Sequence, residues 1–322
     1  MFRDRAYYEP LSAEPRAAQT AVLFPAGSGS VPFAANPGRH LAWDISLGRE
    51  IPILGWQSSR AGADELGVPQ KSFGVGLFFP LSFHMIEDMG KDESNPILNT
   101  DYRFGGMVKA QWGLPHQWGP IQDGHVGLRY VFLGHESTHL GDEFTLAATR
   151  IYGRAFQRVN VSYEYWELGG SFEPNVLADG RLRLRLRGGV IRVFDQQKGW
   201  YDSRLLQPFG DTIAPSRRNV EPYLGVDLSL HPGANGFAPF GSFDFRDRTV
   251  YGYARNSAAD PDDVQGSINI LAGVHHVRDN ANIQPSYYVR YYYGVNPAGQ
   301  FRSQKNYQLF GIGIRFHFNI EL

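Results

Sequence analysis

The segment Gly180–Asp195 reads GRLRLRLRGGVIRVFD, and its alternation decides the fold of this chain. Successive side chains of a β-strand point to opposite faces. One face therefore carries Arg181, Arg183, Arg185 and Arg187, and the other face carries a ribbon of leucines. A helix would scatter both sets around its axis, so the segment predicts a strand.

Such a strand fits two kinds of β protein. A soluble sandwich would bury the leucines in its core, whereas a membrane barrel would turn them to lipid and the arginines to its lumen. From Ala17 onward about twelve segments alternate in this way, with turn residues between them. Tryptophans are expected near one end of several strands, as an interfacial girdle: Trp56, Trp112, Trp118 and Trp166. We therefore predict an all-β fold, a transmembrane antiparallel β-barrel of about 12 strands in the bacterial outer membrane.

Composition narrows the classes of protein further. The 322 residues include 31 basic and 32 acidic ones, and this balance gives no sign of a nucleic-acid partner. There is no cysteine, which excludes disulfides and thiolate metal sites. A mean hydropathy of -0.34 argues against a transmembrane helix. The opening MFRDRAYYEP does not read as a signal peptide, so we expect a mature chain behind an added methionine.

Two regions are expected, an N-terminal periplasmic segment at 1–16 and the barrel at 17–322. Arginines inside a narrow barrel are costly unless acids pair with them, and the neighbouring strands supply acids on the same predicted face. We predict a salt-bridged, largely closed lumen, and the alternative is a narrow anion-selective channel. The predicted network consists of Arg158, Glu164, Arg181, Arg183, Arg185, Arg187, Glu221 and Asp227.

The densest polar cluster is Gly134–Phe144, GHESTHLGDEF, where a strand runs into an outer loop. Alternation puts His135, Ser137 and His139 on one face of the strand, which we assign to the lumen. A hairpin would bring the next strand beside it at the outer rim. The polar residues of these two strands and their loop are His135, Ser137, His139, Asp142, Glu143, Arg158, Asn160, Ser162 and Glu164.

Three motifs resemble an uncharacterised bacterial family of predicted outer-membrane β-barrels, known as a domain of unknown function. They are a His-x-Ser-x-His-Leu-Gly-Asp-Glu run at His135–Glu143, an Arg-x-Asn-x-Ser-x-Glu run at Arg158–Glu164, and an early Pro-Leu then Ala-Glu-Pro-Arg box at Pro10–Arg16. In the early box, Glu14 stands where the family usually has aspartate. The resemblance implies the fold and the compartment but no known activity.

The His-x-Ser pair is also similar to that of outer-membrane phospholipases and lipid A deacylases. These barrels carry the pair on a strand near the outer leaflet, completed by an asparagine or glutamate. The similarity implies that His135 is the general base, Ser137 the nucleophile and Asn160 the residue that orients the imidazole. Two features differ: Thr138 follows the serine where the phospholipases have asparagine, and their pair faces lipid, whereas we assign this pair to the lumen.

Two other interpretations of the rim cluster remain open. In the first, its residues form a hydrogen-bonded network that holds loop and rim together. In the second, His135, His139, Asp142 and Glu143 bind a metal ion. Two histidines at i and i+4 of a strand lie about 13 Å apart, so that site would need the strand to end or bend. No metal site is firmly predicted.

The expected partners follow from the predicted compartment. We expect contact with outer-membrane lipids and lipopolysaccharide, and with the outer-membrane assembly machinery, whose signal the phenylalanine-rich last strand resembles. A protein partner is left unspecified, and no cofactor is expected apart from Ca²⁺ at acidic outer loops. These loop acids are Glu87, Asp88, Asp92, Glu93, Asp260, Asp262 and Asp263. The candidate functions are a structural or lipid- or partner-binding envelope barrel, a lipid hydrolase and an anion channel.

Overall fold

The described part of the chain consists almost entirely of β-strands. The computed structural model describes residues 14, 19–26, 42–58, 73–88, 97–113, 124–139, 157–174, 182–202, 207–209, 219–232, 236–249, 264–277, 283–298 and 305–318. Thirteen strands lie in these ranges: β1 Thr20–Ala26, β2 Ala42–Gln57, β3 Phe73–Asp88, β4 Ile97–Gly113, β5 Gly124–His139, β6 Gln157–Pro174, β7 Leu182–Asp202, β8 Gln207–Phe209, β9 Val220–Leu230, β10 Phe237–Thr249, β11 Val264–His276, β12 Ile283–Gly294 and β13 Tyr307–Phe318. Within those ranges no helix is long and apolar enough to cross a membrane.

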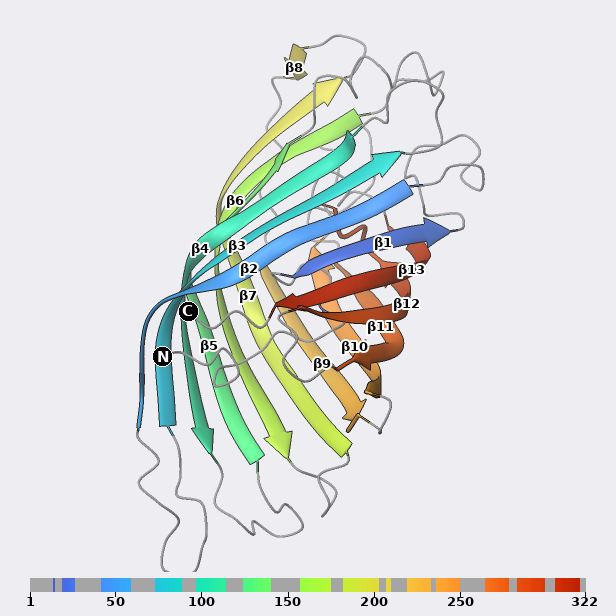
Figure 1. The fold of residues 1–322 in the computed structure, drawn as a ribbon. Coiled ribbons are helices and arrows are strands. Elements are labelled where there is room, and N and C mark those ends of the chain that lie inside the picture. The colour runs from blue at the N-terminus through green and yellow to red at the C-terminus, as the bar shows by residue number, and fades with distance from the viewer. Residues whose placement is uncertain are drawn as a thin grey trace, which may run out of the picture.

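The strands close into a single antiparallel barrel. Each strand pairs with its neighbour in the chain, except that β9 pairs with β7, and the pairings β1–β13 and β6–β7 leave no gap in the ring. The short strand β8 is outside the ring and pairs antiparallel with the last three residues of β7 (Figure 1). The predicted all-β barrel of 12 antiparallel strands is therefore confirmed.

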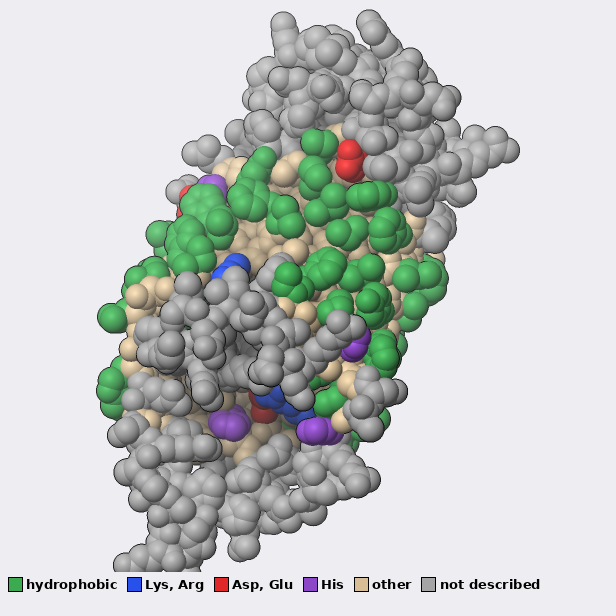
Figure 2. All heavy atoms as spheres, in the orientation of Figure 1, with side chains coloured by type: hydrophobic (Ala, Val, Ile, Leu, Met, Phe, Trp, Pro, Cys, Tyr) green, Lys and Arg blue, Asp and Glu red, His purple; other side chains and the backbone are tan. Residues whose placement is uncertain are grey.

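The wall of the barrel is apolar outside and polar inside. Large apolar side chains such as Leu54, 68% exposed, and Ile312, 61% exposed, cover the outer surface, while Asp244 and Arg246 are at most 4% exposed. Figure 2 shows hydrophobic side chains spread over the described wall on the face in view. Soluble proteins bury apolar side chains and expose charged ones, so this arrangement excludes the soluble sandwich.

An aromatic cluster marks the end of the barrel opposite β8. Trp56 on β2 and Trp112 on β4 both lie outside the wall, and the ring of Phe73 sits between them at centroid distances of 5.7 and 5.1 Å. Trp118 lies outside the described residues, and Trp166 falls in the middle of β6 instead of at its end. The predicted girdle is thus described at Trp56 and Trp112.

A β-bulge in β5 reverses the face that we predicted for the rim motif. Between Val131 and Gly134 the strand has one more residue than β6 opposite it, so Phe132 and Leu133 are both exposed, at 44% and 53%. Beyond the bulge, the buried residues are Gly134, Glu136 and Thr138. His135 and Ser137 consequently face outward, and our assignment of this pair to the lumen is wrong.

The bulge has a clear physical reason. Strict alternation would have turned Leu133 into the lumen and Glu136 to the apolar outside. A charged side chain on the lipid face destabilises a barrel, although an acid costs less than the about 2–4 kcal/mol of an arginine or lysine at mid-depth. One extra residue instead exposes Leu133 and buries Glu136, which is 4% exposed.

The neighbouring strand β6 also has the opposite phase to the one we predicted. Its interior residues are Tyr163, Tyr165 and Glu167, and Glu164 faces outward beside His135. Glu164 therefore does not belong to the lumen network. The carboxylate of Glu167, in the middle of the wall, needs the interior arginines around it, and this requirement sets the phase of the whole strand.

Two further pieces of chain lie inside the barrel. Glu14, the one described residue before position 19, is 1% exposed among interior arginines. At the β8 end, the segment after β12 turns inward, where Val295 N donates to Ser267 Oγ at 3.1 Å and Val295 and Asn296 are fully buried. The expected division into residues 1–16 and 17–322 stays a prediction, because Glu14 alone of that first segment is described.

Candidate functional site

The first candidate site is on the outside of the wall, near the β8 end of β5 and β6. His135 lies directly opposite Glu164 in the strand register, and its Nδ1 is 3.1 Å from Glu164 Oε1. The His135 ring also packs on Phe104 of β4, with ring centroids 4.9 Å apart. Ser137 shares this outward face and lies opposite Ser162. These contacts come from three adjacent strands, so the imidazole is held on a rigid wall.

The pair of His135 and Glu164 can prepare an imidazole for base chemistry. A carboxylate that accepts a hydrogen bond from Nδ1–H fixes the tautomer and leaves Nε2 as the basic nitrogen. The two side chains are 25% and 29% exposed, so substrate can reach them. Within the described part of the chain, Ser137 makes no hydrogen bond to His135, and its hydroxyl would have to turn toward Nε2 to be activated.

Several predicted rim residues lie outside the described part of the chain. The side chains of His139, Arg158 and Asn160 lie outside the described residues, as do Asp142 and Glu143 entirely. The orienting role that we predicted for Asn160 therefore stays untested. The structure instead puts Glu164 at hydrogen-bonding distance from His135. The sequence offered this residue, but an uninterrupted alternation placed it in the lumen.

The second notable site is a charged network in the interior. Arg187 contacts both Glu14 and Glu167, the latter with Nη2 3.1 Å from Oε1. Glu167 is completely buried, and its Oε1 also accepts a hydrogen bond from the Tyr223 hydroxyl at 2.7 Å. On its other side, Arg103 and Arg129 lie 3.4 and 3.7 Å from Glu167 Oε2. Glu167 is thus the centre of the network, although the alternation of β6 in the sequence predicted Glu164 there instead.

Glu14 is the carboxylate that the N-terminal segment adds to this network. Burial raises the pKa of its carboxyl, but Arg187, Arg129 and Arg246 outweigh burial and hold that pKa well below its ordinary value. Glu14 is therefore ionised inside the barrel. Its only signal in the sequence is its place in the early Ala-Glu-Pro-Arg box.

The arginine strand continues the network toward the other end of the barrel. Arg185 Nε donates to Glu173 Oε1 at 2.6 Å, and Arg185 Nη1 lies 3.8 Å from Asp227 Oδ2. Arg183 also contacts Glu173, at 3.3 Å, but its side chain is 60% exposed. Glu221 is buried on β9 and accepts a hydrogen bond from Thr249 N at 3.3 Å. Arg181 lies outside the described residues.

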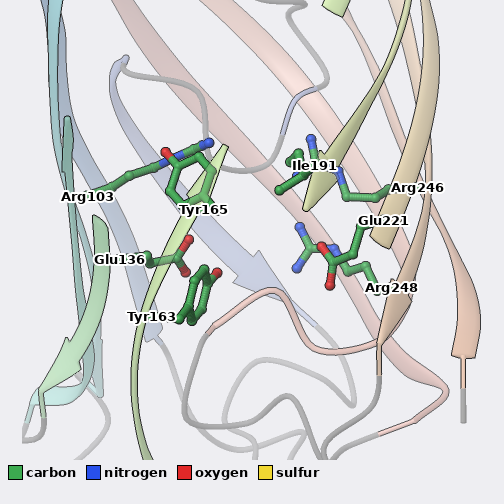
Figure 3. A pocket seen from close by; sticks show the side chains of 8 residues that line it. All are labelled: Arg103, Glu136, Tyr163, Tyr165, Ile191, Glu221, Arg246 and Arg248. Atoms are coloured by element: carbon green, nitrogen blue, oxygen red, sulfur yellow. The ribbon is translucent and has the colours of Figure 1, made fainter. Parts of the chain in front are cut away.

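Charged and aromatic side chains face each other across a small cavity in the interior. Figure 3 shows Arg103, Glu136 and Tyr165 on one side of a small cavity, and Glu221 and Arg248 on the other. The cavity has room for about one water molecule. In the ranges that the structure covers, no three acids, histidines or cysteines are arranged to hold a metal ion. The Ca²⁺ expectation depends largely on loop acids outside those ranges.

Comparisons with known proteins concern the fold. No protein-family model and no curated protein matches the sequence, so the resemblance to the uncharacterised barrel family stays a prediction. Among solved structures, outer membrane phospholipase A from Escherichia coli is 12% identical, with 97% of this chain and 95% of that chain covered and a TM-score of 0.40. The Salmonella typhi outer membrane phospholipase, a dimer with bound calcium, is also 12% identical, with 96% of each chain covered and a TM-score of 0.40.

A third similar structure is the translocator domain of the autotransporter NalP from Neisseria meningitidis. It is 12% identical, with 94% of this chain and 87% of that chain covered and a TM-score of 0.38. At these identities and scores, the likeness extends to the barrel fold alone.

Proposed function

We propose that this chain is an outer-membrane β-barrel that hydrolyses lipid esters at its outward rim site. His135 would act as the general base, Ser137 as the nucleophile and Glu164 as the carboxylate that orients the imidazole. The observation that carries the proposal is the contact of 3.1 Å between His135 Nδ1 and Glu164 Oε1, with Ser137 two residues along the same outward face. A serine, a histidine and a carboxylate are the components of a hydrolytic triad.

The outer-membrane location rests on the wall itself. A closed ring of strands satisfies the backbone polar groups internally, which is what the hydrocarbon region of a membrane requires. Exposed apolar side chains occur on strands all round the ring, including Leu47, Leu128, Leu224 and Phe310. A site on the outside of such a wall meets lipid molecules, so lipids are the substrates within its reach.

The chemistry would proceed in two balanced steps. Ser137 Oγ bonds to the acyl carbon while His135 Nε2 takes the hydroxyl proton, and Glu164 stabilises the imidazolium. The ester bond to the alcohol then breaks, and His135 returns the proton to the leaving oxygen. A water molecule next attacks the acyl–serine in the same way, which releases the fatty acid and restores the serine.

The interior gives less support to the anion channel. Glu14, Glu167 and Glu173 already neutralise the arginines that would line such a pore. The described cavity between Arg103 and Arg248 holds about one water. A structural or partner-binding role for the barrel is the alternative if the rim site has no activity.

The test is fatty-acid release by the barrel refolded in phospholipid–detergent micelles, with and without calcium. We expect wild type to release acid, and Ser137→Ala to lose at least about 10³-fold of the rate. Ser162→Ala is the matched control, since Ser162 lies opposite Ser137 on the same face, and it should keep the activity. Heat-modifiable gel mobility would show that every variant is folded. Equal rates for wild type and Ser137→Ala, or no release by either, would reject the proposal.

A further inference from the structure

Inside the barrel, three arginines surround the carboxylate of Glu14, which belongs to the segment before β1 and not to a strand of the wall. Glu14 contacts Arg187 closely, but its nearest approaches to Arg246 and Arg129 are 3.7 and 4.0 Å. Those two distances exceed the length of a hydrogen bond. Among the residues that the structure describes, neither Glu14 Oε1 nor Arg246 Nη2 has a hydrogen-bond partner, although both are buried.

The shape of a carboxylate explains why Glu14 lies close to Arg187 but farther from Arg129 and Arg246. A carboxylate offers two oxygens in one plane, so it can form close forks with one or two guanidinium groups. Arg129, Arg187 and Arg246 come from three different strands, β5, β7 and β10, and all three approach the Glu14 carboxylate. A tetrahedral oxyanion has four oxygens in three dimensions, and it could accept from all three groups at once.

The charge around Glu14 also favours an anion. Glu167 and Glu50 contact some of the same cations, and Asp244 acts electrostatically on Arg246. Glu221 also acts electrostatically on Arg246, so four acids besides Glu14 stand beside five basic side chains of the described interior, which are Arg103, Lys109, Arg129, Arg187 and Arg246. Without the Glu14 carboxylate, the cluster would hold uncompensated positive charge in a poorly solvated space.

The cavity of Figure 3 provides additional room beside this position. Arg103 and Arg246 line it, and Arg246 is also the residue that points toward Glu14. The cavity alone accepts about one water. An anion larger than water does not fit this cavity, so at this position it would take the place of the Glu14 side chain.

We propose that Arg129, Arg187 and Arg246 form a binding site for a small tetrahedral oxyanion, phosphate or sulfate, which Glu14 occupies as a built-in ligand. Because Glu14 belongs to the same chain, its effective concentration at the site is high, and the wild-type barrel excludes the free anion. Removal of the Glu14 carboxylate opens the site. This inference is independent of the hydrolase proposal, since it concerns the inside of the wall.

The experiment compares wild type with Glu14→Ala, both refolded in detergent with chloride as the only small anion. Equilibrium dialysis with radiolabelled sulfate should show one bound sulfate per Glu14→Ala barrel and none per wild-type barrel. Sulfate or phosphate should raise the thermal unfolding midpoint of Glu14→Ala by several degrees and leave wild type nearly unchanged at matched ionic strength. Chloride and acetate should raise the thermal unfolding midpoint of Glu14→Ala less than sulfate does, because neither anion can contact three arginines together.

A matched control removes a different interior carboxylate. Glu173 also contacts two arginines, but Arg183 beside it is 60% exposed, so Glu173→Ala should bind sulfate at least about tenfold more weakly. If Glu14→Ala refolds only when sulfate is present, that rescue supports the site. If it refolds under no condition, Glu14→Gln replaces it with the same dialysis. The proposal is overturned if the Glu14 variants bind no sulfate, or bind it no better than Glu173→Ala.

Discussion

Glu164 Oε1 lies 3.1 Å from His135 Nδ1 on the outside of the barrel wall. Strict alternation along both strands predicted that the two side chains would meet in the lumen. They do meet, but on the other face, because β5 contains a bulge at Phe132 and Leu133 and β6 has the opposite phase. The pairing of His135 with Glu164 therefore lies on the apolar outer face of the wall instead of in the charged interior.

The Glu164 carboxylate should matter for the rate of catalysis more than for folding. Glu164→Gln keeps the shape but cannot stabilise the imidazolium, so we expect the turnover of lipid ester to fall by about 10²–10⁴-fold. The KM should change little, because the carboxylate is placed behind the imidazole and not against the substrate. Steady-state kinetics of fatty-acid release measure both quantities.

Glu136 provides the comparison for that variant. It is next to His135 in sequence, but it points into the interior and is 4% exposed. Glu136→Gln should therefore alter stability and leave the rate of ester hydrolysis within about threefold of wild type. Equal losses of turnover in Glu136→Gln and Glu164→Gln would show that the hydrogen bond to His135 has no catalytic part.

Gly134 is required by the close approach of Tyr165. A Cβ at Gly134 would lie 2.3 Å from the Tyr165 ring, which is 2% exposed and bonded through its hydroxyl to Arg103. Gly134→Ala should destabilise the barrel by about 1–3 kcal/mol, since that ring has little room to move. Urea unfolding in lipid vesicles measures the change.

Gly170→Ala is the control for that substitution. Gly170 lies on β6, and the nearest atom to an added Cβ there is 3.8 Å away, an ordinary contact. We expect a change of less than about 0.5 kcal/mol at this position. If Gly134→Ala were as stable as Gly170→Ala, the Tyr165 ring could move away from the added methyl group without loss of stability, which would contradict this prediction.

The Glu14 carboxylate should make stability depend on pH. Its pKa in the folded barrel is lowered, so its contribution is present above the unfolded value of about 4.3 and is lost as the pH falls through the folded value. The difference in thermal unfolding midpoint between wild type and Glu14→Gln should be largest at neutral pH and should shrink below about pH 4. Other carboxylates titrate in both barrels, so a difference that stays constant from pH 7 to about pH 3 would contradict the role of the Glu14 charge.

The barrel could be predicted from the sequence because apolar and polar residues alternate along most of its strands. On β7 the leucines and arginines separate to the two faces, and on β12 the tyrosines at 287 and 291 face outward while Ser286 and Arg290 face inward. The prediction from alternation fails at Phe132 and Leu133, because a bulge formed by two apolar residues cannot be recognised in the sequence. It also could not locate Glu167 as the network centre, since the partners of Glu167 come from four other strands, β4, β5, β7 and β9.

Leu224 tests whether the apolar wall faces lipid. It lies in the middle of β9 and is 50% exposed. On a soluble protein, an exposed leucine replaced by arginine changes stability by about 0.5 kcal/mol or less. In a bilayer, Leu224→Arg should cost about 2–4 kcal/mol, because the guanidinium loses its hydration at mid-depth. Urea unfolding in vesicles measures this loss of stability.

Gln308→Arg serves as the control for Leu224→Arg, since Gln308 is exposed near the start of β13. Near an interface the same charge costs at most about 1 kcal/mol. Equal, small costs at both positions would mean that this wall is wet, and the lipid substrate proposed for the rim site would then lose its basis.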